Sequence, residues 1–212
     1  MIKALFIDLD NCLFDTQSMG LDIVRPVLAA MMDADPYEIL ELERRERIIA
    51  ALWTSSLQDV IESHGIPEDI ADAMRVAYAN LEAPLWSKCY DDVGLLRETN
   101  LRKILVTSGH SKLQLSKIRV TGIQGLFEEI VIDAIDDPLA RPGKLNIFRE
   151  LMAKNGWQAH EVAVLGDNPR SELKAGKELG MLTIQVLRPG VKCVEGFDYY
   201  VVDLKEVLRI LG

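Results

Sequence analysis

Two aspartate residues follow the first apolar run of the chain. Asp8 and Asp10 are separated by one residue, and because successive side chains of an extended strand point to opposite sides, both carboxylates face the same side. Carboxylates that lie this close repel each other and favour a bound cation. A polar strand end that enters a turn produces the same pattern, so the function of the pair depends on what other strands bring beside it.

Two later apolar runs also end in polar residues. Gly109, at the end of the first of these, has no side chain, so backbone amides there can approach an anion closely. Ligands of open α/β sheets bind beyond the carboxyl ends of the strands, so these residues are predicted to gather with the aspartate pair. They are Thr107, Ser108 and Gly109 after residues 104–106, and Asp167 and Asn168 after residues 162–165.

Cations and a further acid stand close to these strand ends in the sequence. Arg141 and Lys144 precede an amphipathic segment of helical length, and Glu172 follows Asp167 within the next turn. Acids, hydroxyl groups and cations together are the groups that a phosphate and its counter-ion require.

These residue types suit phosphoryl transfer. The carboxylates of Asp8, Asp10 and Asp167 are hard oxygen ligands, which suit Mg²⁺ with retained waters and a substrate phosphate. An ionised aspartate attacks phosphorus to form an aspartyl-phosphate. Asp10 is placed to protonate the leaving oxygen and later to deprotonate the attacking water. Thr107 and a lysine would hold the nonreacting oxygens.

Short runs rich in isoleucine, valine and leucine recur along the chain and predict strands. Continuous apolar runs suit strands that are buried on both faces, as in a parallel sheet. Amphipathic segments separate them, which favours an α/β fold with a doubly wound, mostly parallel sheet. The expected strands are residues 2–7, 103–106, 129–132, 162–165, 183–187 and 199–202, and the helical segments among them are residues 91–99, 145–155, 172–179 and 204–211.

One long segment interrupts this alternation. It has no convincing strand pattern and predicts helices at residues 38–51 and 69–81. Its length of roughly 70 residues far exceeds the few that join a strand to a helix, so we expect an inserted helical subdomain. The predicted organisation is an α/β core domain of residues 1–16 and 88–212 and a helical cap subdomain of residues 17–87.

Two features of the predicted cap carry structural expectations. Trp53 and Trp86 are expected to pack in its core. The charged run at residues 41–47 is expected to form a solvated helix face with pairs of opposite charge three and four residues apart. Substrate binding by Arg44, Arg45 or Arg47 is the less favoured alternative.

The residues at the strand ends resemble the motifs of the haloacid dehalogenase superfamily, and within it the phosphatase-like members with a helical cap between the first and second motifs. An apolar strand followed by Asp-x-Asp matches DLDNCLFD, and a strand ending in Thr or Ser matches ILVTSG. A strand ending in Gly-Asp, with an acid a few residues on, matches VAVLGDNPRSE. With AGKELGMLTIQV and YYVVDLKEVL, the likeness covers nearly the whole chain and implies a Rossmann-like core.

The resemblance implies a role for each matched residue. Asp8 would be the nucleophile, Asp10 the general acid/base and Thr107 a phosphate ligand, while Asp8, Asp167 and the backbone carbonyl of Asp10 would hold Mg²⁺. Members that cleave carbon–halogen bonds usually lack the second aspartate, because their leaving group needs no proton, so Asp10 favours phosphoryl transfer. The remaining predicted site residues are Ser108, Gly109, Lys144 and Arg141 for phosphate binding and Asn11, Asn168 and Glu172 in support.

The chain departs from the superfamily pattern at three places. Asn11 and Cys12 replace the common Gly-Thr after the aspartate pair, which we interpret as variation rather than loss. Glu172 replaces the usual aspartate, and its extra methylene is expected to place it beside the metal ligands rather than among them. In the third motif we favour Lys144 over Arg141, because a compact ammonium suits charge stabilisation between the nucleophile and a phosphate.

Composition excludes several other classes of function. The 212 residues include 24 Lys and Arg against 33 Asp and Glu, and the net charge of −9 argues against a nucleic acid polymer or an anionic membrane as partner. No uncharged stretch approaches the roughly 20 residues that cross a bilayer. Three dispersed cysteines without metal-binding spacing, and a start without a signal-peptide pattern, predict a cytoplasmic protein.

The sequence therefore predicts a Mg²⁺-dependent phosphomonoester hydrolase acting on a small phosphorylated metabolite, with its oligomeric state open. A phosphomutase needs the same nucleophile and acid/base but passes the phosphoryl group to a sugar phosphate. A catalytically impaired relative would bind phosphate without turnover. A response-regulator receiver also combines clustered aspartates, a threonine and a lysine, but the helical insert counts against that alternative.

Overall fold

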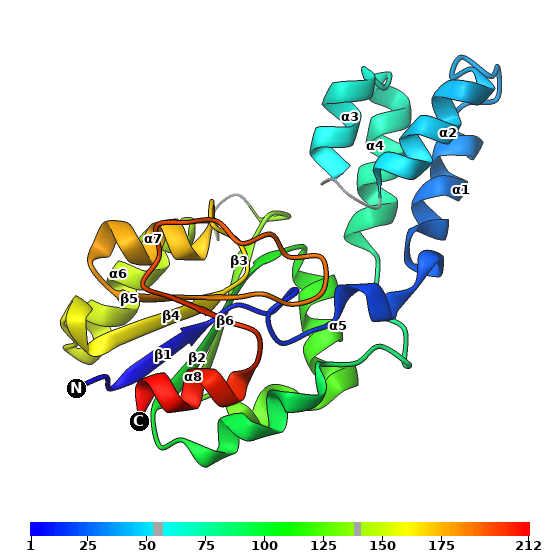
Figure 1. Cartoon of the computed structure of the whole chain (residues 1–212). Helices are drawn as coiled ribbons and strands as arrows, with labels where there is room; N and C mark the ends of the chain where they lie inside the picture. The colour runs from blue at the N-terminus through cyan, green and yellow to red at the C-terminus, as the bar shows by residue number, and fades with distance from the viewer. Residues whose placement is uncertain (53–56, 138–140) are drawn as a thin grey trace. The chain divides into compact units, whose positions relative to one another are not determined.

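The computed structural model describes residues 1–52, 57–137 and 141–212 (Figure 1). Trp53 lies outside these described residues. The strands are β1 Ala4–Ile7, β2 Arg102–Gly109, β3 Glu129–Ala134, β4 Val162–Gly166, β5 Leu182–Val186 and β6 Tyr199–Val201. The α-helices are α1 Arg25–Asp33, α2 Leu42–Ala51, α3 Leu57–His64, α4 Glu68–Ala79, α5 Ser111–Thr121, α6 Lys144–Asn155, α7 Glu172–Leu179 and α8 Leu204–Leu211. Short 3₁₀ helices are η1 Thr16–Met19, η2 Leu21–Val24, η3 Asp91–Glu98, η4 Ile123–Leu126 and η6 Ala159–Glu161.

These elements form two compact units. One comprises Met1–Ser18 and Leu85–Gly212 and contains the sheet, and the other comprises Met19–Pro84 and is helical in its described part. Across the described residues, no helix combines the length and the apolar character that a bilayer crossing requires.

The sheet confirms the predicted doubly wound α/β architecture. Its strands run in the order β3-β2-β1-β4-β5-β6, and all neighbouring pairs are parallel. The chain moves outward from β1 to β3 and then crosses to β4 on the other side of β1. The direction of strand order therefore reverses between β1 and β4, which is where open α/β sheets bind their ligands.

The apolar runs are buried because helices cover both faces of the sheet. Helices α6 and α7 lie on one face, and α5 and α8 lie on the other (Figure 1). On the first face, Phe6 of β1 packs against Phe148 and Trp157, with ring centroids 5.2 Å and 6.1 Å away. Burial of such aromatic side chains is a main source of stability in a domain of this size. This packing fixes the strands whose ends carry the predicted site.

Within the helical unit, one buried acid determines where a helix begins. The side chain of Asp35 accepts hydrogen bonds from the amides of Ile39 and Leu40 at 2.7 Å and 3.0 Å, and its Oδ2 lies 2.9 Å from a nitrogen of Arg45. These contacts hold residues 35–40 in a turn, so α2 begins at Leu42 and not at residue 38, where the periodicity placed it.

Three other expectations differ from the structure. The amphipathic segment expected at residues 91–99 is a 3₁₀ helix, η3, that ends at Glu98. Trp86 is 64% exposed and belongs to the sheet-containing unit, so the expectation that it packs in a cap core is wrong. Arg44 and Arg45 are not simply solvated, because Arg44 donates to the Gly65 carbonyl at 2.8 Å and Arg45 pairs with Asp35.

Candidate active site

The parallel register of the central strands gathers the predicted acids and hydroxyl groups. Ile7 at the end of β1 lies opposite Leu105 of β2 and Leu165 of β4. The amide of the next residue, Asp8, donates to the Leu165 carbonyl at 2.9 Å. The side chains that this register brings to the carboxyl edge of the sheet are those of Asp8, Thr107 and Asp167.

A tight turn follows the aspartate pair. Asn11 has a left-handed backbone with φ of 51°, which asparagine tolerates better than most residues. Its amide donates to the Phe14 carbonyl at 2.9 Å, and its side-chain oxygen accepts from the Thr16 hydroxyl. Burial and the charge of Asp8 raise the pKa of the Cys12 thiol, which keeps it protonated and unreactive. Asn11 and Cys12 are thus accommodated in a hydrogen-bonded turn directly after the aspartate pair.

Lys144, the first residue of α6, lies between two buried carboxylates. Its Nζ is 2.6 Å from Asp8 Oδ1 and 2.7 Å from Glu172 Oε2. Burial lowers the pKa of Lys144, but the two carboxylates raise it more, so its pKa lies above the usual value and the ammonium stays charged. Arg141 is exposed. In the described part of the chain, the structure thus brings Lys144, and not Arg141, to Asp8.

Three acids form a cluster at the centre of the site. Asp8, Asp167 and Glu172 each offer a carboxylate oxygen, and these oxygens lie within 4.8 Å of one another. Burial raises the pKa of Asp8 although Lys144 opposes the shift, and burial together with the Glu172 charge raises the pKa of Asp167 to about 7. Burial is the largest cause of both shifts, and the charges of neighbouring carboxylates add to it. A hard divalent cation such as Mg²⁺ fits this set of oxygen donors.

Glu172 is fixed by its close approach to the end of β4. The residue is 1% exposed, and its Oε1 accepts from the Asn168 amide at 2.8 Å. A Cβ on Gly166 would lie 2.2 Å from that oxygen, so only glycine leaves room for the carboxylate. Glu172 was expected beside the metal ligands, and the structure groups its oxygen with those of Asp8 and Asp167.

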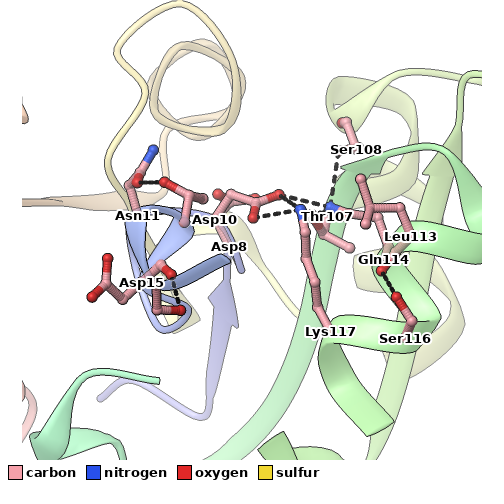
Figure 2. Close-up of polar contacts among 12 residues, drawn as sticks. Asp8, Asp10, Asn11, Asp15, Thr107, Ser108, Leu113, Gln114, Ser116 and Lys117 are labelled. Atoms are coloured by element: carbon pink, nitrogen blue, oxygen red, sulfur yellow. Dashed lines mark hydrogen bonds and ion pairs between the residues drawn. The ribbon is translucent and has the colours of Figure 1, made fainter. Parts of the chain in front are cut away.

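The second acid, Asp10, contacts two residues that the sequence analysis missed. Lys117 Nζ lies 2.7 Å from Asp10 Oδ1 and 2.9 Å from Oδ2, and Gln114 Nε2 donates to Oδ2 at 2.9 Å (Figure 2). Both residues belong to α5 and are three positions apart, which places them on one helix face. That spacing is their only signal in the sequence, and it does not indicate which strand end the face meets.

The hydroxyl groups at the end of β2 have different partners. Thr107 Oγ1 accepts from Gln114 Nε2 at 2.6 Å, so its own hydrogen is left to donate elsewhere. Ser108 Oγ donates to Asp133 Oδ2 at 3.0 Å, and the other Asp133 oxygen accepts from the Gly143 amide at 2.9 Å. Asp133 was also missed, although it stands near the end of β3 and the rule that identified the other strand-end acids applies to it.

Most of the residues predicted for the site line one pocket of about 180 Å³. Arg141 instead lines an adjoining pocket of about 450 Å³, which shares Ser108, Lys144 and Ser171 with the first. Gly109 lies against the side chain of Gln114. The residues that line the smaller pocket are Asp8, Asp10, Asn11, Thr107, Ser108, Lys144, Asp167, Asn168, Ser171 and Glu172.

Comparison with known proteins adds a family and several relatives. Residues 2–180 match the family described as haloacid dehalogenase-like hydrolase. A protein of Methanocaldococcus jannaschii is 24% identical and aligns over 100% of this chain and 97% of its own length. A protein of Methanopyrus kandleri is 26% identical over 89% of this chain and 85% of its own length. Both are named glyceraldehyde 3-phosphate phosphatase.

A solved structure supports the fold. The HAD-hydrolase YfnB from Bacillus subtilis, described as bound to magnesium, superposes with a TM-score of 0.70. The alignment covers 100% of this chain and 99% of that chain at 18% identity. At that level of identity the likeness establishes the shared architecture.

Proposed function

The chain belongs to the haloacid dehalogenase-like hydrolases, and on that premise we propose that it is a Mg²⁺-dependent phosphatase of a small phosphorylated metabolite, working through an aspartyl-phosphate on Asp8. The observation that carries the proposal is the surroundings of Asp8. Its carboxylate is paired with Lys144 at 2.6 Å and belongs to the cluster with Asp167 and Glu172. A second carboxyl group, Asp10, follows two residues later, as a leaving group that needs a proton requires.

The balance of charge supports a divalent cation. The pocket contains the carboxylates of Asp8, Asp10, Asp167 and Glu172. When all four are ionised, before Asp10 takes up the proton that it later gives to the leaving oxygen, the ammonium groups of Lys144 and Lys117 offset two of these charges among the described residues. Mg²⁺ would be held by the side chains of Asp8 and Asp167 and the backbone carbonyl of Asp10, and it would supply positive charge beside the transferring phosphoryl group.

In the first half-reaction, an Asp8 carboxylate oxygen attacks phosphorus while the bond from phosphorus to the ester oxygen breaks. Lys144 holds Asp8 Oδ1 and so fixes the plane of the attacking carboxylate. Thr107 directs its hydroxyl hydrogen to a nonreacting phosphate oxygen, because its own oxygen is occupied by Gln114. Asp10 gives its proton to the leaving oxygen, which departs as an alcohol.

In the second half-reaction, water attacks the phosphorus of the aspartyl-phosphate. Asp10, now ionised, takes the proton from that water. The bond between Asp8 and phosphorus breaks, which releases inorganic phosphate and regenerates the Asp8 carboxylate. Asp10 is protonated again, so both acids return to their starting forms.

The relatives suggest which substrates to examine first. Because both archaeal relatives are named glyceraldehyde 3-phosphate phosphatase, a triose phosphate is the leading candidate within the small-metabolite class.

The three cysteines are free thiols, which supports the proposed cytoplasmic location, since disulfides are rare there.

The test is release of inorganic phosphate from a panel of phosphomonoesters that includes glyceraldehyde 3-phosphate. Each substrate is incubated with Mg²⁺ or with EDTA, and the wild type is compared with Asp8→Asn and Asp10→Asn. Glu128→Gln serves as the matched control, because Glu128 precedes β3 and so lies at the opposite edge of the sheet. We expect turnover that requires both Mg²⁺ and Asp8, with the control at wild-type rate.

Three results would contradict the proposal. Phosphate release by Asp8→Asn at the wild-type rate would exclude Asp8 as nucleophile. Transfer of the phosphoryl group to a sugar phosphate in place of water would identify a phosphomutase. Mg²⁺ binding without turnover of any substrate would indicate a relative that binds phosphate but has lost catalysis.

A further inference from the structure

A buried polar network connects Asp10 with Thr107. Lys117 and Gln114 are 4% and 1% exposed. Lys117 Nζ donates to Gln114 Oε1 at 2.7 Å, and Gln114 Nε2 contacts both Asp10 Oδ2 at 2.9 Å and Thr107 Oγ1 at 2.6 Å (Figure 2). One face of α5 thus touches the acid that follows β1 and the hydroxyl group that ends β2.

Stability alone does not account for this network. A buried ion pair commonly stabilises a protein no more than apolar side chains of similar size, because both charges must be desolvated. An apolar residue at position 117 has a surface to pack on, since Lys117 Nζ lies 5.5 Å from the centroid of the Phe14 ring. The pair does what an apolar side chain does not, which is to hold both oxygens of Asp10 in one orientation.

Gly109 provides an independent indication that the position of Gln114 matters. A Cβ on Gly109 would lie 2.9 Å from Gln114 Cδ and 3.0 Å from its Cγ. A side chain at position 109 would therefore push the amide of Gln114 away from Asp10 and Thr107. The absence of a side chain at the end of β2 is what admits Gln114 to the site.

We propose that Gln114 and Lys117 are positioning residues for the leaving-group step, holding the Asp10 carboxyl group at a fixed spacing from the Thr107 hydroxyl. The inference rests on the proposed function, in which Thr107 binds the phosphate and Asp10 protonates the leaving oxygen. Proton transfer requires donor and acceptor within hydrogen-bond reach. Because Gln114 contacts both residues, the phosphate that Thr107 binds brings its ester oxygen to an acid already in place.

The test separates substrates by their need for a proton. An alkyl phosphate such as glycerol phosphate loses a strongly basic alkoxide, whereas p-nitrophenyl phosphate loses a phenolate that departs without protonation. The values of kcat/KM, which report formation of the aspartyl-phosphate, are measured for both substrates. The variants are Lys117→Met, Gln114→Leu, Gly109→Ala and the conservative Lys117→Arg, with Asp10→Asn as reference and Lys112→Met, an exposed lysine of the same helix, as control.

We expect the ratio of kcat/KM between the two substrates to change. In Lys117→Met and Gln114→Leu, the value for the alkyl phosphate should fall about 10- to 100-fold, because a misplaced acid loses part of the advantage of general acid catalysis. The value for p-nitrophenyl phosphate should stay within about threefold of wild type, as in Asp10→Asn. Gly109→Ala should follow Gln114→Leu, Lys117→Arg should recover part of the ratio, and Lys112→Met should match wild type.

Two outcomes would overturn the inference. Equal losses on both substrates would mean that the pair supports phosphate binding or the fold in general. Unchanged kinetics in Lys117→Met and Gln114→Leu would mean that Asp10 is positioned without them.

A second measurement keeps this inference separate from the proposed function. If the wild type hydrolyses neither substrate, the proposed function fails, and urea unfolding of Asp10→Asn, Lys117→Met and the double variant still tests the contact. Destabilisation by the double variant that is smaller than the sum of the two single effects would support the network, and additive effects would overturn it.

Discussion

The contact between Gly166 and Glu172 allows a sharp test of how the site is built. A Cβ at position 166 would lie 2.2 Å from Glu172 Oε1 and 2.4 Å from Cγ, whereas nonbonded carbon atoms prefer about 3.5 to 4.0 Å. Glu172 is 1% exposed, so its side chain has little free space. We therefore expect Gly166→Ala to displace the Glu172 carboxylate from its position above β4.

The expected cost follows from the contacts that the displacement breaks. Overpacking of a buried site typically costs about 1 to 3 kcal/mol. Glu172 would also lose its bonds to Lys144 Nζ and to the Asn168 amide, and a hydrogen bond to a charged group contributes about 1.5 to 3 kcal/mol. These contributions sum to about 4 to 9 kcal/mol, and because the site relaxes in part we expect a loss near the lower end, about 4 to 6 kcal/mol of unfolding free energy.

Activity should fall with stability, for a related reason. Lys144 is held at Asp8 partly by its second partner, Glu172. When that partner moves, the ammonium is free to leave its position beside Asp8, the proposed nucleophile. Because small misplacements of a reacting group reduce rates by about 100-fold, we expect a loss of that order in kcat/KM for Gly166→Ala.

Urea unfolding and phosphate release measure the two effects, with Gly125→Ala as the control. A Cβ at Gly125 meets no atom within 4 Å, so its stability should stay within about 1 kcal/mol of wild type. In a Glu172→Ala background the obstructing carboxylate is gone, and the further change Gly166→Ala should cost less than about 1 kcal/mol. Wild-type stability of Gly166→Ala, or the same cost in both backgrounds, would refute the reasoning.

Two further predictions concern metal binding and acid stability. In urea unfolding, Mg²⁺ at about 100 times its Kd should raise the unfolding free energy by about 2.7 kcal/mol, and EDTA should reverse the rise. The variant Asp167→Ala should not show this rise. If Mg²⁺ stabilised Asp167→Ala as much as wild type, the proposed ligand set would be wrong. In the helical unit, burial raises the pKa of Asp35, but the Leu40 amide, the Arg45 side chain and the Ile39 amide lower it more, so the net pKa lies below the usual value. The contribution of Asp35 to stability is therefore complete above about pH 4 and is lost as the pH falls through the folded-state pKa. Urea midpoints measured on either side of about pH 4 should fall less steeply with acid in Asp35→Asn than in wild type, and identical slopes would show that Asp35 does not contribute.

The central part of the site could be predicted because parallel strands impose strong geometric limits. Once the apolar runs are taken as neighbouring parallel strands, the residues after them must emerge at one edge. Asp8, Thr107 and Asp167 follow three adjacent strands, β1, β2 and β4, and the register places them together. No knowledge of helix packing was needed for that inference.

The rest depends on helix packing that the sequence does not specify. Gln114 and Lys117 have the spacing of an ordinary buried helix face. That face meets Asp10 only because α5 packs against β2 and β3. In the same way, the periodicity that predicted a helix from residue 38 could not show that Asp35 binds the amides of Ile39 and Leu40. Side chains that hold backbone groups compete with helix formation, and propensity patterns do not reveal the outcome.

The arrangement of the two lysines suggests how the chain keeps the two proposed catalytic acids, Asp8 and Asp10, apart. Asp8 and Asp10 are too close in sequence to be independent, and their carboxylates repel each other. Each has an ammonium partner from a different helix: Lys144 of α6 at 2.6 Å from Asp8, and Lys117 of α5 at 2.7 Å from Asp10. Because α6 and α5 cover opposite faces of the sheet (Figure 1), the two acids are held from opposite sides.

Because Asp8 and Asp10 each have their own lysine partner, loss of one lysine should affect only the proposed role of the acid that it contacts. Loss of Lys144 should impair the attack on phosphorus whatever the leaving group, because Lys144 contacts Asp8, the proposed nucleophile. Loss of Lys117 should matter only when the leaving oxygen needs the proton from Asp10. The same pair of substrates therefore distinguishes the two lysines: Lys144→Met should lower kcat/KM for alkyl and p-nitrophenyl phosphates alike, and Lys117→Met should lower it for the alkyl phosphate alone. If both lysine variants gave the same pattern, the two acids would have to be treated as one coupled unit.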